Sequence, residues 1–289
     1  MSAGSPANCE RFSWQSVPSL LSLCINFVAD NLDLVESFQH FPDLLGKEIF
    51  LAAERNEQFA RPDPTVIQRL ELFSKAFSTE FLQSLYLSRE HLLVNYLSDD
   101  FLLFAGVQSL NLSHCGLSDD HEILYKLSCF TNLNTLSLQD NALTSRGLQK
   151  LTLPLRMFNR GPKLLKALDL SENPELTIHG IRYLKAYPLL CVLNLSNTAI
   201  SKNDTKLQLL SMKVCIPEEG VSGGLDSCFR LQTEGWASNV INTWLTWYNN
   251  KSKRPRLGEN SFYSKQRLKF RLTKCESYTK PRYQLILKK

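Results

Sequence analysis

The stretch VQSLNLSHCGL, residues 107–117, carries the spacing that decides the fold. Apolar residues stand at its first, fourth, sixth and eleventh positions, and a cysteine stands at the ninth. The spacing returns, with asparagine or threonine at the ninth position, in LNTLSLQDNAL (133–143), LKALDLSENPEL (165–176, its last leucine one place late) and LCVLNLSNTAI (190–200). A weaker copy is LQSLYLSREHL (82–92). The central leucines, which lie 25, 26, 32 and 25 residues apart, are Leu85, Leu110, Leu136, Leu168 and Leu193.

This spacing is typical of leucine-rich repeats, in which each unit contributes one short strand and its turn. Alternate leucines of a strand point inward, and the ninth side chain can hydrogen-bond backbone groups that are freed where the strand ends. We therefore predict an α/β fold: a leucine-rich-repeat solenoid over residues 82–202, with short parallel strands on the concave face and helices on the convex face. Unrelated strands of an α/β sheet would not explain four copies that each match at four or more positions.

The segments between the strands predict the helices of the convex face. Ser118 and Thr144 precede two of them and are predicted to be N-caps. The 32-residue interval contains an additional piece, LPLRMFNRGPKLLK (153–166), which we expect to form a loop on one face. Its basic residues suit either a partner-contacting loop or a solvated linker; they are Arg156, Arg160 and Lys163.

The strand positions between the leucines are expected to face solvent and to form the concave binding surface. Their side chains are small and mostly uncharged, which suits contact with a protein but identifies no ligand. The candidate partner-binding residues of this surface are Asn111, Ser113, Asn134, Ser137, Gln139, Asp169 and Asn194.

Residues 16–81, after an N-terminus (1–15) predicted to be disordered, are expected to form a helical N-terminal cap. Within it, Leu20, Cys24 and Val28 lie at i, i+4 and i+8 on one helix face. This spacing resembles the box by which substrate receptors of elongin-dependent ubiquitin ligases bind their adaptor, and the segment around Pro42 resembles the cullin-selecting segment of such receptors. The resemblance implies elongin B and C and a cullin as partners of residues 19–50. The alternative is a plain cap, which the exposed end of a solenoid needs in any case.

The C-terminal part is predicted to contain a capping segment (203–249) and a basic, disordered tail (250–289). TEGWASNVINTWLTWYNN (233–250) predicts a tryptophan-rich helix that covers the last repeat, with a free partner-binding helix as the alternative. The residues from 251 onward contain thirteen lysines and arginines and two glutamates. This composition suits a nuclear import signal, nucleic-acid binding or a solvated tail. The import-like residues are Lys251, Lys253, Arg254 and Arg256.

Catalytic motifs are missing from the sequence. It contains no HExxH, Walker, GxGxxG or GxSxG pattern, so we expect no catalytic, metal-binding or cofactor-binding residue and no enzymatic activity. The eight cysteines are scattered without a CxxC pair, which predicts reduced thiols in the nucleus or cytoplasm. The sequence contains no run of 18 apolar residues, so we expect no membrane span.

Four longer stretches carry a resemblance to a known family. They are SLLSLCINFVADNLDLVESFQHFP (19–42), LNLSHCGLSDDHEIL (110–124), LTLPLRMFNRGPKLLKALDLSENPELT (151–177) and TEGWASNVINTW (233–244). Together they resemble the leucine-rich repeat-containing protein 42 family over roughly residues 17–250. The resemblance implies a repeat scaffold without known enzymatic activity and a part in nuclear, growth-related processes.

Overall fold

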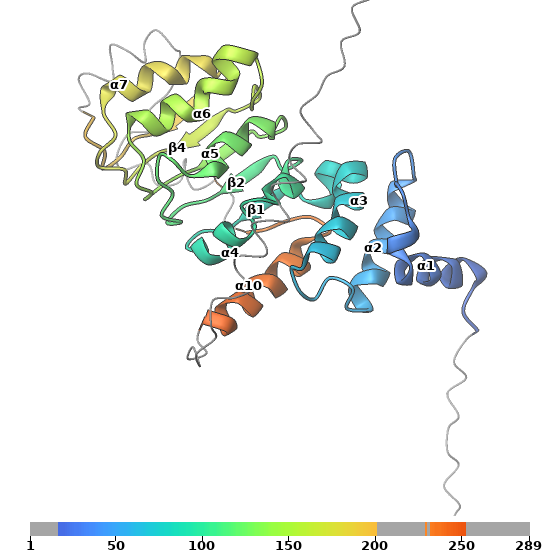
Figure 1. Cartoon of the computed structure of the whole chain (residues 1–289). Coiled ribbons are helices and arrows are strands. Elements are labelled where there is room, and N and C mark those ends of the chain that lie inside the picture. Colours follow the sequence, from blue (N-terminus) through green and yellow to red (C-terminus); the bar gives the residue numbers. More distant parts are fainter. Residues whose placement is uncertain (1–16, 201–228, 230–231, 253–289) are drawn as a thin grey trace, which may run out of the picture. The chain divides into compact units, whose positions relative to one another are not determined.

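The computed structural model describes residues 17–200, 229 and 232–252. The chain divides into two compact units, Met1–Tyr248 and Asn249–Lys289, and the described part of the second is the end of one helix. The elements, shown in Figure 1, are α1 (Leu20–Asp30), η1 (Leu32–Leu34), α2 (Asp43–Arg55), α3 (Pro64–Phe81), β1 (Ser84–Tyr86), α4 (His91–Tyr96), η2 (Phe101–Phe104), β2 (Ser109–Asn111), α5 (Glu122–Lys126), η3 (Leu127–Cys129), β3 (Thr135–Ser137), α6 (Ser145–Phe158), β4 (Ala167–Asp169), α7 (Ile178–Ile181), η4 (Arg182–Ala186), β5 (Val192–Asn194) and α10 (Ser238–Ser252).

The five strands form one parallel sheet in the order β1-β2-β3-β4-β5. The central leucine of each repeat is in register with that of the next, from Leu85 through to Leu193. This arrangement confirms the predicted stack of parallel repeats, and it includes the weaker first copy. Each strand is only three residues long, as expected when one unit supplies one rung and its neighbours supply the next.

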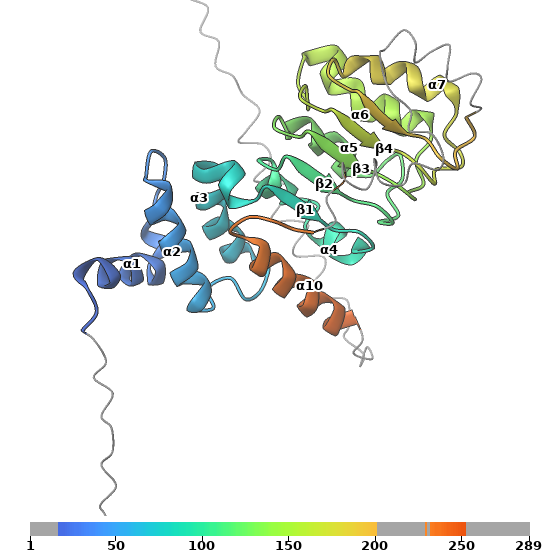
Figure 2. The same cartoon turned by 180° about the vertical axis from the view of Figure 1, so that it is seen from behind.

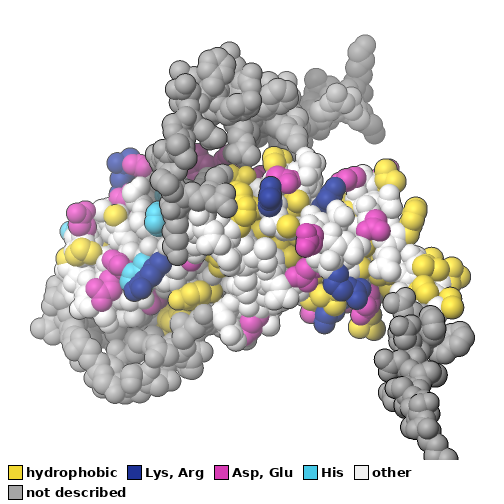
Figure 3. Space-filling view, turned by 90° about the horizontal axis from the view of Figure 1, so that it is seen from below, with side chains coloured by type: hydrophobic (Ala, Val, Ile, Leu, Met, Phe, Trp, Pro, Cys, Tyr) yellow, Lys and Arg dark blue, Asp and Glu magenta, His cyan; other side chains and the backbone are white. Residues whose placement is uncertain are grey.

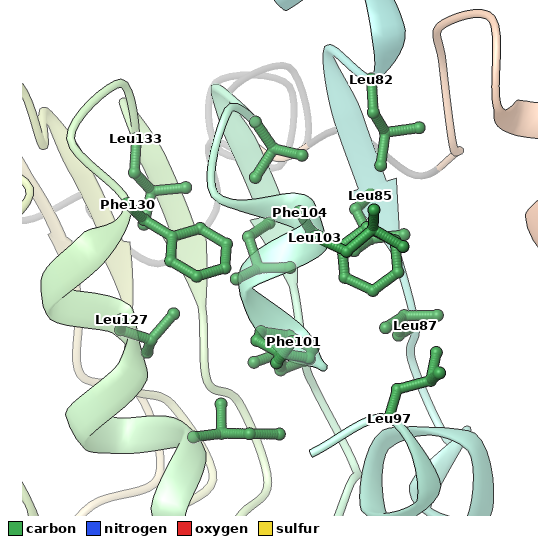
Figure 4. Packing of buried hydrophobic residues seen from close by; sticks show 14 of the residues in the cluster. Leu82, Leu85, Leu87, Leu97, Phe101, Leu103, Phe104, Leu127, Phe130 and Leu133 are labelled. Atoms are coloured by element: carbon green, nitrogen blue, oxygen red, sulfur yellow. The ribbon is translucent and has the colours of Figure 1, made fainter. Parts of the chain in front are cut away.

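The core lies between the sheet and the helices that cover one of its faces (Figures 1 and 2). The inward leucines of the strands are fully buried, and phenylalanines from the helical side pack against them (Figure 4). The rings of Phe101 and Phe130 lie 5.6 Å apart, so that aromatic contacts connect one repeat with the next. Burial of a leucine or phenylalanine side chain stabilises a fold by roughly 1.5–3 kcal/mol, and this packing is the main stabilising contribution here.

In the three central repeats the side chain at the ninth position holds the turn by hydrogen bonds. Asn141 donates from Nδ2 to the carbonyl groups of Leu112 and Gln139, at 3.0 and 3.1 Å, and its Oδ1 accepts from the Leu117 N–H at 2.9 Å. Asn173 bonds in the same manner one repeat further on. At the same position, the Cys115 thiol donates to the carbonyl of Leu87 at 3.1 Å. The inward ninth side chain therefore satisfies backbone groups that would otherwise be buried without partners.

The helical side differs in detail from the prediction. Thr144 is an N-cap, since its hydroxyl accepts from the Arg146 N–H, but the prediction for Ser118 is wrong. Helix α5 begins only at Glu122, after His121, and Ser118 forms an isolated bridge with Ala142 instead. A Ser-Asp-Asp run suits an N-cap locally, but pairing with the neighbouring repeat keeps Ser118 extended.

The additional piece of the fourth repeat lengthens a helix rather than forming only a loop. Helix α6 continues through Pro154 to Phe158 and ends at Asn159, whose left-handed backbone (φ 55°) terminates it. The loop proper is thus confined to residues 159–166, between α6 and β4. A proline inside a helix removes one hydrogen bond and crowds the carbonyl four residues earlier, yet the 14-residue helix α6, which packs on its neighbours, continues past Pro154.

The tryptophan-rich helix does not cover the last repeat, and the prediction of its position is wrong. Both views place α10 beside α3 and β1, at the other end of the sheet (Figures 1 and 2). Glu234 pairs with Ser84 on the outer edge of β1, and Trp244, fully buried, donates from Nε1 to the carbonyl of Phe59 at 2.8 Å. The periodicity predicts a helix with an apolar face, but it does not say which open edge that helix reaches.

Gly235 makes this return of the chain possible. Its φ is +132°, and a Cβ atom there would lie 2.6 Å from the Cα of Leu82. Only glycine allows both the backbone conformation and the close approach to β1. Trp236 then inserts next to Phe77, with 5.0 Å between ring centroids. The Thr-Glu-Gly-Trp element therefore connects the segment before α10 with the end of α3 and with β1.

Candidate interaction surface

Helix α1 begins after Ser19, whose hydroxyl accepts from the Ser22 N–H at 3.1 Å. Its inner face packs against α2: Ala29 is fully buried there, and Ile25 and Val28 are partly buried against the same core. This face accounts for the stability of the helix in the fold.

The opposite side of α1 is also apolar, and it is exposed. Leu20, Leu23 and Phe27 expose 77%, 51% and 69% of their surface, and Cys24 is exposed between them. These four residues follow the i, i+3, i+4, i+7 spacing of a single stripe, which we call the outer face of α1. Apolar side chains gather at this end of the molecule in Figure 3. A helix that is apolar on two opposite sides is normally covered on both, and exposed patches of this kind mark interaction sites.

The structure separates the three residues of the predicted box. Leu20 and Cys24 lie on the outer face, whereas Val28 turns toward the inner face and is half-buried. Pro42 is exposed and directly precedes α2, the helix that packs on α1. Leu23 and Phe27 belong to the apolar periodicity of this segment but not to the predicted box, and they complete the exposed stripe.

Several strand residues predicted to face solvent are in fact buried. Asn111, Ser113, Ser137 and Asp169 expose between 2% and 7% of their surface, so the prediction of an open polar surface at these positions is wrong. Three other predicted residues are half-buried; they are Asn134, Gln139 and Asn194.

Hydrogen bonds within the repeat explain part of this burial. Oδ1 of Asn111 accepts from both the N–H and the hydroxyl of Ser113, at 3.0 and 2.7 Å. Asp169 accepts in the same way from Ser171, and Asn194 from Ser196. These side chains close a local turn at the ends of β2, β4 and β5, which is a structural task.

Asp169 is the charged member of this series. Burial raises the pKa of its carboxyl group, while hydrogen bonds from Ser171 and Asn194 counteract part of that rise. Its carboxylate forms no ion pair with any residue that the structure describes.

The described residues do not assemble a catalytic arrangement around the neighbours His114 and Cys115. The Cys115 thiol points inward, and burial raises its pKa to about 11, so it stays a thiol at neutral pH. His114 points away from it and contacts Asp140. Residues 17–200 and 232–252 also contain no cluster of histidine, cysteine and acidic side chains with metal-binding geometry.

The import-like residues can be placed only in part. Lys251 falls in the last turn of α10, and Lys253, Arg254 and Arg256 lie outside the described residues. The basic tail as a whole also lies outside them. In the part of the chain that is described, no helix has the length and apolar character needed to cross a membrane.

Comparison with known proteins yields close relatives in sequence. No protein-family model matches the chain. It is 34% identical to leucine-rich repeat-containing protein 42 of Xenopus laevis over 236 residues, which is 79% of this chain and 55% of the relative. The rat protein of the same name is 33% identical over 90% of this chain and 63% of its own length, and the human protein 34% identical over 79% and 54%. The chain thus spans a little over half the length of these relatives.

Among solved structures, a chain of the complex of Rad7 and Elc1 in yeast is similar over 70% of this chain and 38% of its own length. The identity is 18% and the TM-score is 0.28, which is too low to support an argument about fold or function. The repeats, their parallel register and the relatives in sequence agree with one another: this chain belongs to the leucine-rich repeat-containing protein 42 family.

Proposed function

We propose that this chain is a non-catalytic interaction protein that binds a protein partner through the outer face of α1. The observation that carries the proposal is the exposed stripe of Leu20, Leu23, Cys24 and Phe27, on a helix whose other side is already packed. Burial of one leucine or phenylalanine contributes roughly 1.5–3 kcal/mol, so a partner that covers three of them gains several kcal/mol. Helices present anchors at this spacing when they bind in an apolar groove of another protein.

A second, more specific proposal names the partner as the elongin B–elongin C adaptor, with this chain acting as the substrate receptor of an elongin–cullin ubiquitin ligase. Two observations support it. Leu20 and Cys24 occupy adjacent turns of the exposed face, so the leucine and the small thiol can enter one pocket together. Pro42, in the segment that resembles a cullin-selecting sequence, is exposed at the start of α2, the helix against which α1 packs.

Binding of purified elongin B–C to the full chain tests the second proposal. Leu20→Ala combined with Cys24→Ala should abolish binding without loss of stability, because both side chains are exposed. A control replaces Leu92 and Leu102, two exposed leucines at α4 and η2, by alanine. Elongin B–C that does not bind the wild-type chain, or that binds the double variant equally well, contradicts this proposal.

The broader proposal has its own test. Leu23→Asp combined with Phe27→Asp places two charges on the outer face while the inner face stays intact. Partners that co-purify with the full chain should include a set that this variant loses and the Leu92/Leu102 control retains. If the two variants retain the same partners, the outer face of α1 is not the docking surface, whatever the outcome with elongin.

A further inference from the structure

Two segments of the last two described repeats are basic, in contrast to the acidic part of the chain that precedes them; the turn between the segments contains Asp169, Glu172 and Glu175. Residues 145–168 contain six lysines and arginines and no acidic residue, and residues 176–200 contain two more and again no acidic residue. By contrast, residues 1–144 contain eight basic and eighteen acidic residues. Helix α6 packs against α7 and η4, so the two basic segments share the helical side of the sheet.

Two arginines from these segments meet at one tyrosine ring. The guanidinium carbon of Arg156, on the last turn of α6, lies 4.7 Å from the ring centroid of Tyr183 on η4, and that of Arg182 lies 4.9 Å from it. Nη2 of Arg182 also donates to the Tyr183 hydroxyl at 3.0 Å. The face of an aromatic ring attracts cations, and it can hold two guanidinium groups that repel each other.

Hydrogen bonds to its own helix fix Arg156. Its Nε donates to the hydroxyl of Thr152, and its Nη2 donates to the carbonyl of Gln149, both at 3.2 Å. A guanidinium group has five N–H donors, so most of its in-plane donors stay available after these two bonds. Less side-chain entropy is then lost when a ligand binds, because the arginine is already positioned.

Neither Arg156 nor Arg182 forms an ion pair with a carboxylate of the described residues. Other basic side chains do find such partners: Arg69 bonds Asp33 with two nitrogens, and both Arg146 and Lys150 contact Asp120. Two prepositioned guanidinium groups without an acidic counterpart form a receptor for an anion that the described chain does not supply.

The surroundings of the two arginines indicate the chemistry of that anion. Leu153, Met157 and Phe158, on the same last turns of α6, are exposed apolar side chains. A nucleic-acid backbone would leave most of this apolar surface uncovered. A polypeptide with carboxylates beside apolar side chains would match both the charge and the apolar fringe.

We propose that Arg156, Arg182 and Tyr183, together called the arginine–tyrosine cluster, bind an acidic segment of a protein partner. The carboxylates bond the in-plane N–H groups of the guanidinium ions, and apolar side chains of the segment lie on the end of α6. This surface is separate from the outer face of α1, and the proposal does not depend on the function proposed for that face.

Site-resolved cross-linking tests the proposal on the full chain. The probe is a 16-residue peptide of Glu-Glu-Leu-Leu units that carries a central photoreactive group, and a peptide with glutamine in place of glutamate is the neutral comparison. Cross-linked chains are digested with a protease that does not cleave at arginine and analysed by mass spectrometry. This readout separates attachment at the cluster from attachment at the basic residues beyond position 250.

We expect cross-links within residues 153–163 and 179–187 with the acidic peptide only. Arg156→Gln combined with Arg182→Gln should reduce them roughly tenfold, as expected when two charge-assisted contacts are lost. The matched control, Arg55→Gln combined with Lys166→Gln, removes the same charge from exposed positions elsewhere and should leave them unchanged. Melting temperatures of all variants should agree within about 2 °C, because none of these side chains is buried.

Three outcomes overturn the proposal. One is an equal yield of cross-links in the two double variants, and another is cross-linking confined to residues 251–289. The third is displacement of the acidic peptide from the cluster by a 16-nucleotide single-stranded DNA at lower concentration than by unlabelled peptide, which would assign the cluster to nucleic acid.

Discussion

Replacement of Asp169 by asparagine should stabilise this protein. Asp169 is in register with Asn194 in the next strand, and both side chains accept from the N–H and the hydroxyl of the serine two residues on. Asn111, two strands earlier, makes the same two bonds. An amide oxygen therefore accepts the two bonds from the serine elsewhere in the same sheet. What the carboxylate adds is a buried charge and a second oxygen that accepts from Asn194.

The expected magnitude follows from that charge. Asp169 is 7% exposed, and burial, as the largest influence, raises the pKa of its carboxyl group above the ordinary 3.8. Removal of this buried charge keeps the oxygen that accepts from Ser171 and loses the one that accepts from Asn194. The net change should increase the free energy of unfolding at pH 7 by on the order of 1 kcal/mol. For a chain of this size, such a gain raises the melting temperature by about 2–4 °C.

The sign of the pH dependence gives an additional check. Because the pKa is raised in the folded state, the folded chain binds the proton more tightly than the unfolded chain does. The wild type therefore loses stability as the pH rises from the ordinary value of 3.8 through the raised folded-state pKa, and the asparagine variant does not. The difference between them should be largest at neutral pH and should close as the pH falls toward 3.8.

Urea unfolding of the full chain, followed by tryptophan fluorescence between pH 4 and 8, measures this difference. The reciprocal variant, Asn111→Asp, installs the charge at the equivalent position and should lose a similar amount of stability at pH 7. Asp169→Ala controls for the hydrogen bonds, and should destabilise because Ser171 loses its acceptor. If Asp169→Asn leaves the stability at pH 7 unchanged or lowers it, the carboxylate is compensated and the reasoning is wrong.

Three further substitutions probe the packing of the fold. Tyr187→Phe should increase the free energy of unfolding by about 1 kcal/mol and raise the melting temperature, because the buried hydroxyl has no hydrogen-bond partner in the described chain. Phe130 fills the equivalent place in an earlier repeat. An unchanged or lower melting temperature would indicate a partner for the hydroxyl. Gly235→Ala should lower the free energy of unfolding in urea by more than about 2 kcal/mol, because the new Cβ would lie 2.6 Å from the Cα of Leu82. Retention of wild-type stability would show that the backbone at Leu82 shifts to accommodate the methyl group. Asn141→Ala should destabilise by about 2–3 kcal/mol through three lost hydrogen bonds, and a loss below 0.5 kcal/mol in calorimetry would contradict its part in the turn.

The placement of the candidate site was only partly predictable. The spacing of Leu20 and Cys24 marked residues that the structure does expose, but the same reasoning assigned Asn111 and Asp169 to an open surface. A strand alternates its side chains between two faces, and this rule identifies a face without saying whether short polar groups on it bond their own backbone. The hydrogen bonds to the following serines decided that question.

The convergence of Arg156 and Arg182 on Tyr183 could not be found in the sequence either. The basic character of residues 153–166 was evident, but Arg156 and Arg182 are 26 positions apart and belong to different repeats. The packing of α6 on η4 brings them together, and the continuation of α6 beyond Pro154 carries Arg156 to that point.

The sequence by itself determined the repeating unit, its parallel stacking and the register of Leu85 through Leu193, because each unit pairs only with the next one along the chain. The tertiary structure alone decided which side of α1 stays exposed and where α10 lies. Both depend on contacts between segments far apart: Glu234 reaches β1 across 150 positions, and local periodicity carries no information about which distant surface an apolar helix will cover.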